Sequence, residues 1–376
     1  MNVQSPLLPI VCAGRIENAL RLIEVGESAP KVYLFTSPHV IRWLTGFNGS
    51  SGWLLIGPMG PVLITDGRYS EQAREQTTAT GVDVRIVEIH QHKAVPGAIA
   101  VAVKGHQYLG FDGSSVSFTA QAEIAIELKK EVDCHLVARN DPTVTLRRCK
   151  TLPEVQRIEL AASYADQALS ENLKLSWIGM TERQLACELE ISMRRAGADT
   201  EAFPTIVASG PNSSRPHHSA GQRAIVDGDV VIIDIGAKVD GYHSDMTRTY
   251  FVGQGHPFLR DAFAVVVESQ ELGVRAIRAG AEAMDIDRAC RAHLSTANLD
   301  HLFVTGSGHG VGLQIHENPW IGATATEILA VGDMVTVEPG IYCEGVGGIR
   351  IEDTVSLESA GPRRLTLTSK DSTCPR

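Results

Sequence analysis

The chain has 376 residues and a formal net charge of −10. Its hydrophobic fraction of 43% and its charged fraction of 21% are those of an ordinary globular protein, and the length predicts two domains. The acidic balance disfavours nucleic acid and anionic membrane surfaces as partners.

The sequence has no feature that would direct it into or across a membrane. Its longer apolar runs, such as residues 98–103 and 230–233, are far shorter than the roughly 20 residues that a spanning helix needs. No basic residue precedes Arg15, and Pro6 and Pro9 interrupt the N-terminal apolar residues, unlike a signal peptide. The seven cysteines are scattered and form no Cys-x-x-Cys pair, which favours free thiols. We therefore expect a cytoplasmic protein.

Residues 1–148 alternate helical and strand patterns, which predicts an N-terminal α/β domain. Helices are expected over residues 14–25, from Pro38 onward with Ser37 as the N-cap, and over 119–130. Strands are expected over residues 32–35, 53–56 and 62–64.

A domain boundary is expected at the basic cluster that ends with Lys150, so that the second domain covers residues 149–376. Two of its helices begin with capping boxes, one formed by Thr151 and Glu154 and the other by Thr181 and Gln184. Two further helices are expected over roughly 258–279 and 285–298.

Strand patterns dominate the rest of the second domain. They cover residues 203–208, 230–235, 242–252, 334–337 and 349–357. The pair Asp240-Gly241 is a hairpin turn signal between two of these strands. Helices followed by antiparallel strands predict an α+β architecture.

Acidic residues end several of these apolar strand patterns. Asp234 follows four aliphatic residues, Glu338 follows the strand over 334–337, and Glu352 follows Ile351. A buried carboxylate is costly unless it is paired or bound to a cation. Each residue alone has an ordinary explanation as a strand-end cap or a salt-bridge partner, but the set indicates a shared site.

Two more residues belong to this set. Asp245 lies across the hairpin from Asp234, and His309 lies in a glycine-rich segment where the backbone can approach a site closely. Four carboxylates and one imidazole suit Mn²⁺ or Mg²⁺ better than a closed zinc site, with Zn²⁺ and Co²⁺ as alternatives. Five ligands are too many for one catalytic zinc and suit two metal ions about 3.5–4 Å apart, which activate water for hydrolysis.

Hydrolysis at such a centre also needs groups that move protons and stabilise an oxyanion. His217, His218 and His316 are the candidates from the sequence. No GxSxG, HExxH or GxxxxGK motif is present, so a serine or cysteine nucleophile has no support.

The region from about 150 to 360 resembles the metallopeptidases of the pita-bread fold, which include methionine aminopeptidase, prolidase and aminopeptidase P. The segments that carry the resemblance are Ile233-Asp234-Ile235-Gly236, Ser244-Asp245-Met246-Thr247, Gly308-His309-Gly310, Ile315-His316-Glu317, Glu338-Pro339-Gly340 and Arg350-Ile351-Glu352.

The resemblance implies a role for each metal ligand. Asp234 would chelate one metal ion, and His309 and Glu338 would bind the other. Asp245 and Glu352 would bridge the two ions.

It also implies roles for residues around the metal ions. Glu338 would act as the general acid and base, and His217 would contact the substrate on the leaving side. His316 would stabilise the tetrahedral intermediate, and Arg350 would orient a ligand carboxylate. Many family members have a further histidine where this chain has Thr305, which affects the expected substrate preference or rate.

The first domain distinguishes the branches of the family. Leu44-Thr45-Gly46-Phe47 and Asp66-Gly67-Arg68-Tyr69 are similar to aminopeptidase P, and prolidases carry looser versions. The resemblance implies an Xaa-Pro aminopeptidase acting on proline-containing peptides, with Xaa-Pro dipeptidase as the alternative. An inactive binding protein and a metal-free hydrolase of creatinase type are less favoured, because all five ligand types are present. Family members commonly form homodimers or homotetramers.

Overall fold

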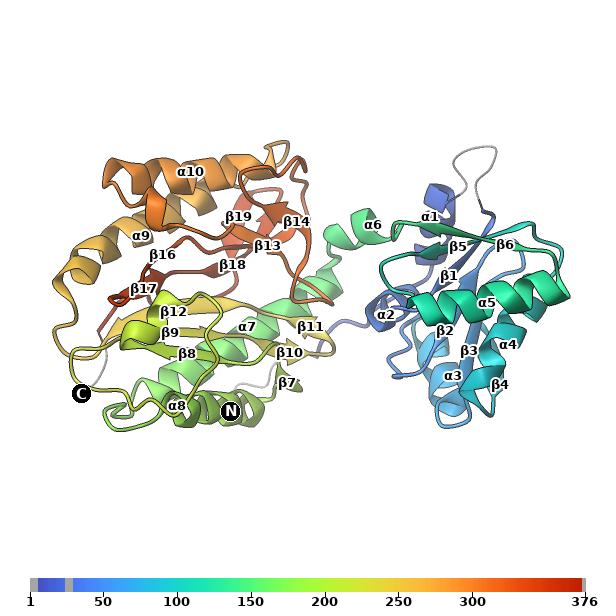
Figure 1. Cartoon of the computed structure of the whole chain (residues 1–376), viewed down its shortest axis with the longest axis horizontal. Coiled ribbons are helices and arrows are strands. Elements are labelled where there is room, and N and C mark those ends of the chain that lie inside the picture. The colour runs from blue at the N-terminus through green and yellow to red at the C-terminus, as the bar shows by residue number, and fades with distance from the viewer. Residues whose placement is uncertain (1–5, 24–29, 374–376) are drawn as a thin grey trace. The chain divides into compact units, whose positions relative to one another are not determined.

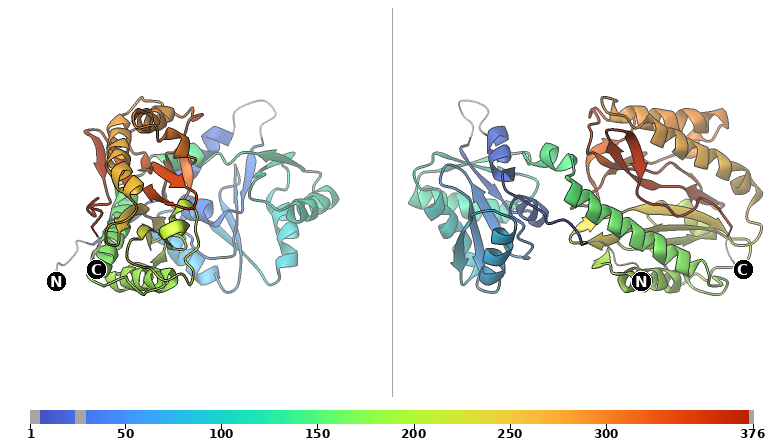
Figure 2. Two further views of the ribbon diagram at one scale, coloured as in Figure 1. Left: turned by 60° about the vertical axis from the view of Figure 1, so that its left-hand side comes forward. Right: turned by 180° about the vertical axis from the view of Figure 1, so that it is seen from behind.

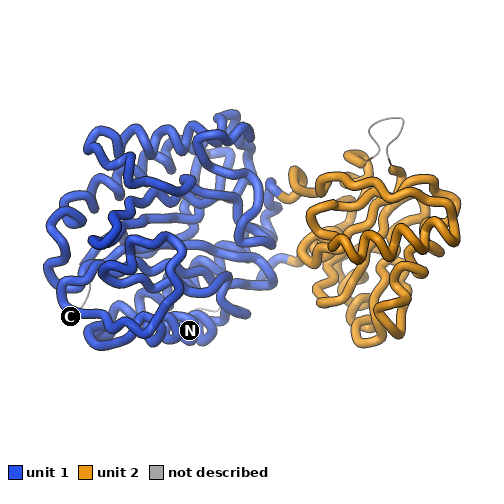
Figure 3. Tube along the Cα trace, viewed as in Figure 1, with its two compact units in different colours: residues 1–8, 148–376 blue, residues 9–147 orange. Residues whose placement is uncertain are grey.

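The computed structural model describes residues 6–23 and 30–373, and the chain divides into two compact units. Unit 1 contains residues 1–8 and 148–376, and unit 2 contains residues 9–147 (Figure 3). The chain therefore starts in unit 1, forms unit 2 and returns to unit 1.

Unit 2 is built on a six-stranded mixed sheet with the order β4-β3-β2-β1-β5-β6 (Figure 1). Its strands are β1 (Val32–Phe35), β2 (Trp53–Ile56), β3 (Val62–Asp66), β4 (Arg85–Ile89), β5 (Tyr108–Asp112) and β6 (His135–Arg139). Strands β1, β2 and β3 pair antiparallel in succession, whereas β4, β5 and β6 each join a parallel neighbour.

Helices cover this sheet. They are α1 (Arg15–Ile23), α2 (Pro38–Thr45), α3 (Ser70–Ala79), α4 (Val95–Ala102), α5 (Phe118–Glu131) and, at the end of the unit, α6 (Val144–Arg148). Val32 and Leu34 pack with Ile99 of α4 and Leu128 of α5. Tyr33 and its alternate neighbours along β1 are buried as well, so both faces of the sheet are covered.

The first half of unit 1 places two helices against antiparallel strands. The helices are α7 (Leu152–Asn172) and α8 (Glu182–Ala196), and both begin with the expected capping boxes. The strands are β7 (Thr200–Glu201), β8 (Ile206–Ser209), β9 (Val230–Ile235), β10 (Ala237–Val239), β11 (Tyr242–His243) and β12 (Met246–Phe251). Strand β9 lies between β8 and β12.

The second half of unit 1 repeats the plan with another pair of helices. They are α9 (Pro257–Ala276) and α10 (Ala283–Thr296). The strands are β13 (Gly308–Gly310), β14 (Glu317–Ile321), β15 (Met334–Val337), β16 (Gly340–Cys343), β17 (Gly347–Arg350), β18 (Asp353–Glu358) and β19 (Gly361–Arg364). Figures 1 and 2 show α7 and α8 on one outer side of unit 1 and α9 and α10 on the opposite side, with the strands between them.

Each half of unit 1 has its own apolar core. Val231 and Ile233 of β9 pack with Leu189 of α8, whereas Val335 and Val337 of β15 belong to the core beneath α9 and α10. Polar side chains can therefore collect where the strands of the two halves meet, since the apolar faces are turned toward the helices.

The structure corrects three expected strands. The strand expected over 242–252 is divided into β11 and β12, with Ser244 and Asp245 outside both. Strand β8 begins at Ile206, because Phe203 and Pro204 do not join the sheet. The expected strand over 349–357 is interrupted at Glu352, whose backbone N–H donates to the carbonyl oxygen of Thr247 over 3.1 Å. The expected hairpin is confirmed, with Asp240 at φ 45° and β10 pairing antiparallel with β11.

The short segment before unit 2 is fixed to unit 1. The backbone N–H of Leu8 donates to the Oε1 atom of Gln156 over 3.1 Å. Arg157, which is buried, donates from Nη1 to the Leu8 carbonyl oxygen over 2.9 Å.

Within residues 6–23 and 30–373, no helix combines the length and the apolar character that a bilayer span requires. Six of the cysteines are free thiols in the described structure, and Cys374 lies outside the described residues.

Candidate metal centre

The five proposed ligands come from both halves of unit 1 and line one cavity of about 1280 Å³. Asp234 stands near the end of β9, and Asp245 directly precedes β12. His309 is the middle residue of β13, Glu338 directly follows β15, and Glu352 lies between β17 and β18. The two halves thus contribute two and three of these side chains, respectively.

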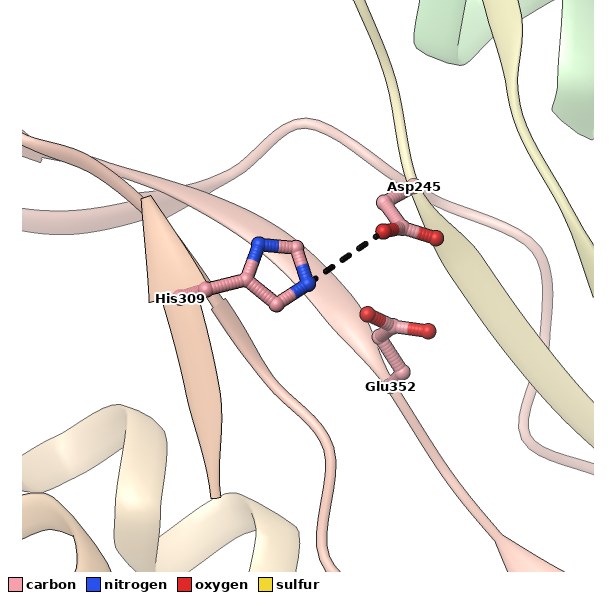
Figure 4. Close-up of side chains that lie close together, drawn as sticks. All are labelled: Asp245, His309 and Glu352. Atoms are coloured by element: carbon pink, nitrogen blue, oxygen red, sulfur yellow. Dashed lines mark ion pairs between the residues drawn. The ribbon is translucent and has the colours of Figure 1, made fainter. Parts of the chain in front are cut away.

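Three of the five form the tightest group. Asp245, His309 and Glu352 each offer one ligand atom, and these atoms lie within 4.8 Å of one another (Figure 4). The Nε2 atom of His309 is 3.6 Å from Oδ2 of Asp245 and 3.4 Å from Oε1 of Glu338. This spacing suits ligands around a shared cation.

Two buried carboxylates each keep one oxygen free toward the cavity. Asp234 accepts a hydrogen bond at Oδ2 from Nη2 of Arg350 over 2.7 Å, whereas its Oδ1 atom is buried without a partner. Glu352 accepts at Oε2 from the Thr247 hydroxyl over 2.6 Å, and its Oε1 atom is likewise buried without a partner. Buried polar atoms are nearly always paired in proteins, so these two oxygens fit a metal-binding role.

The tautomer of His309 also fits metal binding. Its Nδ1 atom lies 3.0 Å from the carbonyl oxygen of Gly310, which can only accept a hydrogen bond. Nδ1 therefore carries the proton, and the lone pair of Nε2 faces Asp245 and Glu338. Burial lowers the pKa of His309, which favours the neutral form that binds metals.

The carboxylates of the centre are electrostatically unfavourable without cations. Burial, followed by the charges of Glu352, Asp234 and Glu338, raises the pKa of Asp245 well above its usual range. Burial and the neighbouring Glu338 and Asp234 do the same to the pKa of Glu352. Burial raises the pKa of Glu338 to about 7, although the nearby Arg350 opposes the shift. Bound cations would reverse this repulsion, so the donor set fits divalent metal ions.

Arg350 organises two of the ligands. Besides Asp234, it donates from Nε to the hydroxyl oxygen of Thr247 over 3.0 Å, and that hydroxyl donates to Glu352. Its Nη1 atom donates to the Tyr342 hydroxyl over 2.8 Å. The guanidinium thus holds Asp234 directly and Glu352 through Thr247.

The three histidines that the sequence offers as catalytic candidates differ in position. The centroids of the His316 and His309 rings are 4.4 Å apart, and the two ring planes form an angle of 84°. Burial and the nearby His309 lower the pKa of His316. His217 is exposed and lines the cavity, directly after Pro216, whose carbonyl oxygen accepts from Arg350. His218 lies 2.8 Å from Oε2 of Glu182 through its Nε2 atom.

Sequence reasoning missed Glu182 as a hydrogen-bond partner of residues 209–221, because its place in the first turn of α8 suggests an exposed side chain. It is fully buried and accepts hydrogen bonds from the backbone and hydroxyl of Ser209, from Asn212 and from the backbone of Gly221. Burial alone would raise its pKa, but the hydrogen bonds from Asn212, His218 and Ser209 hold the pKa of Glu182 at about 2. This carboxylate ties down both ends of the loop that carries His217.

Comparison with known proteins identifies the architecture. Residues 156–359 match the model of metallopeptidase family M24, and residues 15–148 match the creatinase/prolidase N-terminal domain. The Xaa-Pro dipeptidase of Pyrococcus horikoshii is 35% identical over 359 residues, which cover 94% of this chain and 98% of the relative.

Two solved structures resemble the whole chain. The Xaa-Pro dipeptidase from Bacillus anthracis has a TM-score of 0.90 and 33% identity, covering 96% of this chain and 99% of that one. The X-Pro aminopeptidase from Thermotoga maritima has a TM-score of 0.84 and 30% identity, and the match covers 96% of this chain and 99% of that one. These matches confirm the expected fold, an α/β domain of creatinase type followed by an α+β domain of pita-bread type.

Proposed function

We propose that this chain, which belongs to metallopeptidase family M24, is an Xaa-Pro aminopeptidase that hydrolyses the peptide bond preceding proline. The observation that carries the proposal is the convergence of four carboxylates and His309 on one cavity. Relatives that match nearly its full length are named for cleavage at proline.

We assign the centre to two divalent cations, with Mn²⁺ as the first choice and Co²⁺ or Zn²⁺ as alternatives. Asp234 would hold one ion, His309 and Glu338 the other, and Asp245 and Glu352 would bridge them. When bound, the ions supply hydroxide near neutral pH and polarise the scissile carbonyl. The free oxygens of Asp234 and Glu352 support this assignment.

The chain's own residues would do the remaining work. Glu338 would take the proton from the attacking water and pass it to the leaving nitrogen, because its carboxylate faces both the ligands and the cavity. His316, packed edge-on against His309, would donate to the oxygen of the tetrahedral intermediate. His217 would contact the substrate on the leaving side, and Arg350 would keep Asp234 oriented.

The size of the cavity supports an aminopeptidase. At about 1280 Å³ it exceeds the usual range of about 300–1,000 Å³ for small-molecule sites, so it has room for residues beyond proline. The names of the Pyrococcus horikoshii and Bacillus anthracis relatives favour the second candidate, an Xaa-Pro dipeptidase. A dipeptidase must pair the free carboxylate of its substrate. Among the described residues that line the cavity, Arg183 is the one arginine whose guanidinium forms no salt bridge, since Arg350 is bonded to Asp234.

The test compares Xaa-Pro dipeptides with Xaa-Pro-Yaa tripeptides, with Mn²⁺ or with a chelator. Metal-dependent cleavage of tripeptides establishes the aminopeptidase. Cleavage of dipeptides alone, with a KM that rises in Arg183→Ala, establishes the dipeptidase. No cleavage of either would support an inactive binding protein, and full activity after chelation would support a metal-free hydrolase of creatinase type.

We also propose, from the family resemblance, that the enzyme is a homodimer or homotetramer of the cytoplasm. Light scattering of the purified protein tests the oligomer, since a monomer at working concentration would contradict it.

A further inference from the structure

We infer that the indole ring of Trp320 is the surface on which the enzyme recognises the proline ring of its substrate. The inference rests on the proposed function, because it concerns how that same cavity selects Xaa-Pro bonds. It starts from a large aromatic side chain whose exposure the core of the protein does not explain.

Trp320 lies next to the metal centre. In the antiparallel pairing of β13 with β14, Trp320 is directly opposite His309. Residues paired in this way project from the same face of a sheet, so both side chains point toward the cavity, which Trp320 lines. The Trp320 ring lies 6.3 Å from the His309 ring and 6.2 Å from the His316 ring.

The indole is also free to receive a ligand. Trp320 is 49% exposed, whereas the residues on either side of it in β14 are buried. The planes of the Trp320 and His316 rings are within 28° of parallel. Of the other aromatic rings in the lining, Phe203 is only partly exposed and Tyr342 is 7% exposed and bonded to Arg350. Trp320 is therefore the most exposed of the Phe, Tyr and Trp rings among the described residues that line the cavity.

Proline needs recognition of this kind. Its nitrogen has no hydrogen within a peptide, so an enzyme cannot select proline through a hydrogen bond from that atom. Selection must come from contact with the flat pyrrolidine ring, whose C–H groups suit the electron-rich face of an indole. All Xaa-Pro substrates share the pyrrolidine ring, so a single aromatic surface beside His316 can bind this part of each of them.

The first experiment measures turnover by the Mn²⁺-loaded enzyme on Ala-Pro-Ala and Ala-Ala-Ala. Trp320→Ala should lower kcat/KM for Ala-Pro-Ala about tenfold, the scale of one lost aromatic contact, and change that for Ala-Ala-Ala by less than roughly twofold. Trp320→Phe should fall between wild type and Trp320→Ala. Val331→Ala is the matched control, because Val331 is also 49% exposed but does not line the cavity.

The second experiment observes binding without turnover. The chain has four tryptophans, of which Trp43 and Trp177 are buried and Trp53 belongs to unit 2. Prolyl-alanine, the leaving fragment of a tripeptide, should change the fluorescence of the loaded wild type, and alanyl-alanine should not. The change should disappear in Trp320→Phe while metal content stays the same.

The outcomes separate the two proposals. A wild type that cleaves no Xaa-Pro peptide overturns the proposed function and this inference together. A wild type that cleaves Ala-Pro-Ala, combined with a Trp320→Ala variant that keeps the full preference for proline, overturns only the role of Trp320. A variant that keeps the preference and changes oligomeric state would place Trp320 in a subunit interface instead.

Discussion

Arg350 donates a hydrogen bond of 2.7 Å to one oxygen of Asp234 and leaves the other oxygen of that carboxylate buried without a partner. The pairing fixes the plane of the carboxylate and directs its free lone pairs into the cavity. Because the same guanidinium also bonds Thr247 and Tyr342, its orientation is determined by several contacts at once.

A lysine should therefore be unable to replace the guanidinium of Arg350. Arg350→Lys keeps the charge but cannot bond Asp234, Thr247 and Tyr342 together, since an ammonium is a single compact donor. Metal affinity and kcat/KM should fall by about 10–100-fold. Calorimetric metal titration and steady-state kinetics check this. The control is Arg363→Lys, at a half-exposed pair with Glu358, which should behave as wild type. An Arg350→Lys enzyme with wild-type metal affinity would contradict the assigned role.

Glu352→Gln should separate metal binding from stability. The variant loses a bridging ligand, so elemental analysis should find at least one metal ion missing. The metal-free protein should melt at a higher temperature than metal-free wild type, because burial and Glu338 oppose the ionisation of Glu352. Adding Mn²⁺ should raise the melting temperature of wild type more than that of the variant. Wild-type metal content in Glu352→Gln would refute the ligand assignment.

His316→Ala should affect turnover without affecting the metal ions. Losing one donor to the oxyanion typically costs about 10²–10³ in kcat. Metal content should stay at the wild-type level, because within the described residues His316 contacts the rings of His309 and Trp320 and forms no hydrogen bond or ion pair with a carboxylate of the centre. A loss of about tenfold or less would assign His316 a packing role beside His309.

Glu182 should make the unfolding free energy of the protein fall as the pH is lowered. Its pKa is lowered from 4.5 to about 2 on folding, so its contribution is complete above pH 4.5 and is lost as the pH falls through about 2. The unfolding free energy of wild type should exceed that of Glu182→Gln on the order of 2 kcal/mol at pH 6 and by less at pH 3. Urea unfolding at both values checks this.

The control for this pH dependence is Glu188→Gln, at an exposed position on the same helix. Its unfolding free energy should equal that of wild type at both pH values. If the difference in unfolding free energy between wild type and Glu182→Gln stayed constant from pH 6 to pH 3, the proposed role of the hydrogen bonds to Glu182 would be contradicted.

Local patterns were sufficient for much of the fold. The bounds of β9 and β15 and the capping boxes of α7 and α8 agree with the expectations, because short apolar runs and the motifs Thr-x-x-Glu and Thr-x-x-Gln act within a few neighbouring residues. The acidic residues that end those strands were recognisable for the same reason, since a carboxylate next to buried aliphatic residues is conspicuous.

Features that depend on distant partners could not be predicted. The strand pattern of 349–357 is continuous in sequence, but β17 pairs with β16 whereas β18 joins a different sheet, and between them the backbone N–H of Glu352 donates to Thr247. Phe203 and Pro204 have strand-like neighbours, yet proline lacks the N–H that a ladder requires. The residues that donate hydrogen bonds to Glu182 lie within 209–221, at least 27 positions away along the chain. A local sequence pattern around Glu182 therefore does not reveal them.

The contact between Leu8 and the buried Arg157 bears on the design of a shortened protein. In the described structure, residues 6–8 belong to the same compact unit as residues 148–373, and unit 2 lies between these two segments along the chain. The Nη1 atom of Arg157 donates to two carbonyl oxygens, that of Leu8 and that of Pro153 in α7, so a protein that starts at Arg148 would lose the first acceptor and keep the second. A shortened protein in which residues 6–8 are joined to Arg148 by a short linker would retain both acceptors.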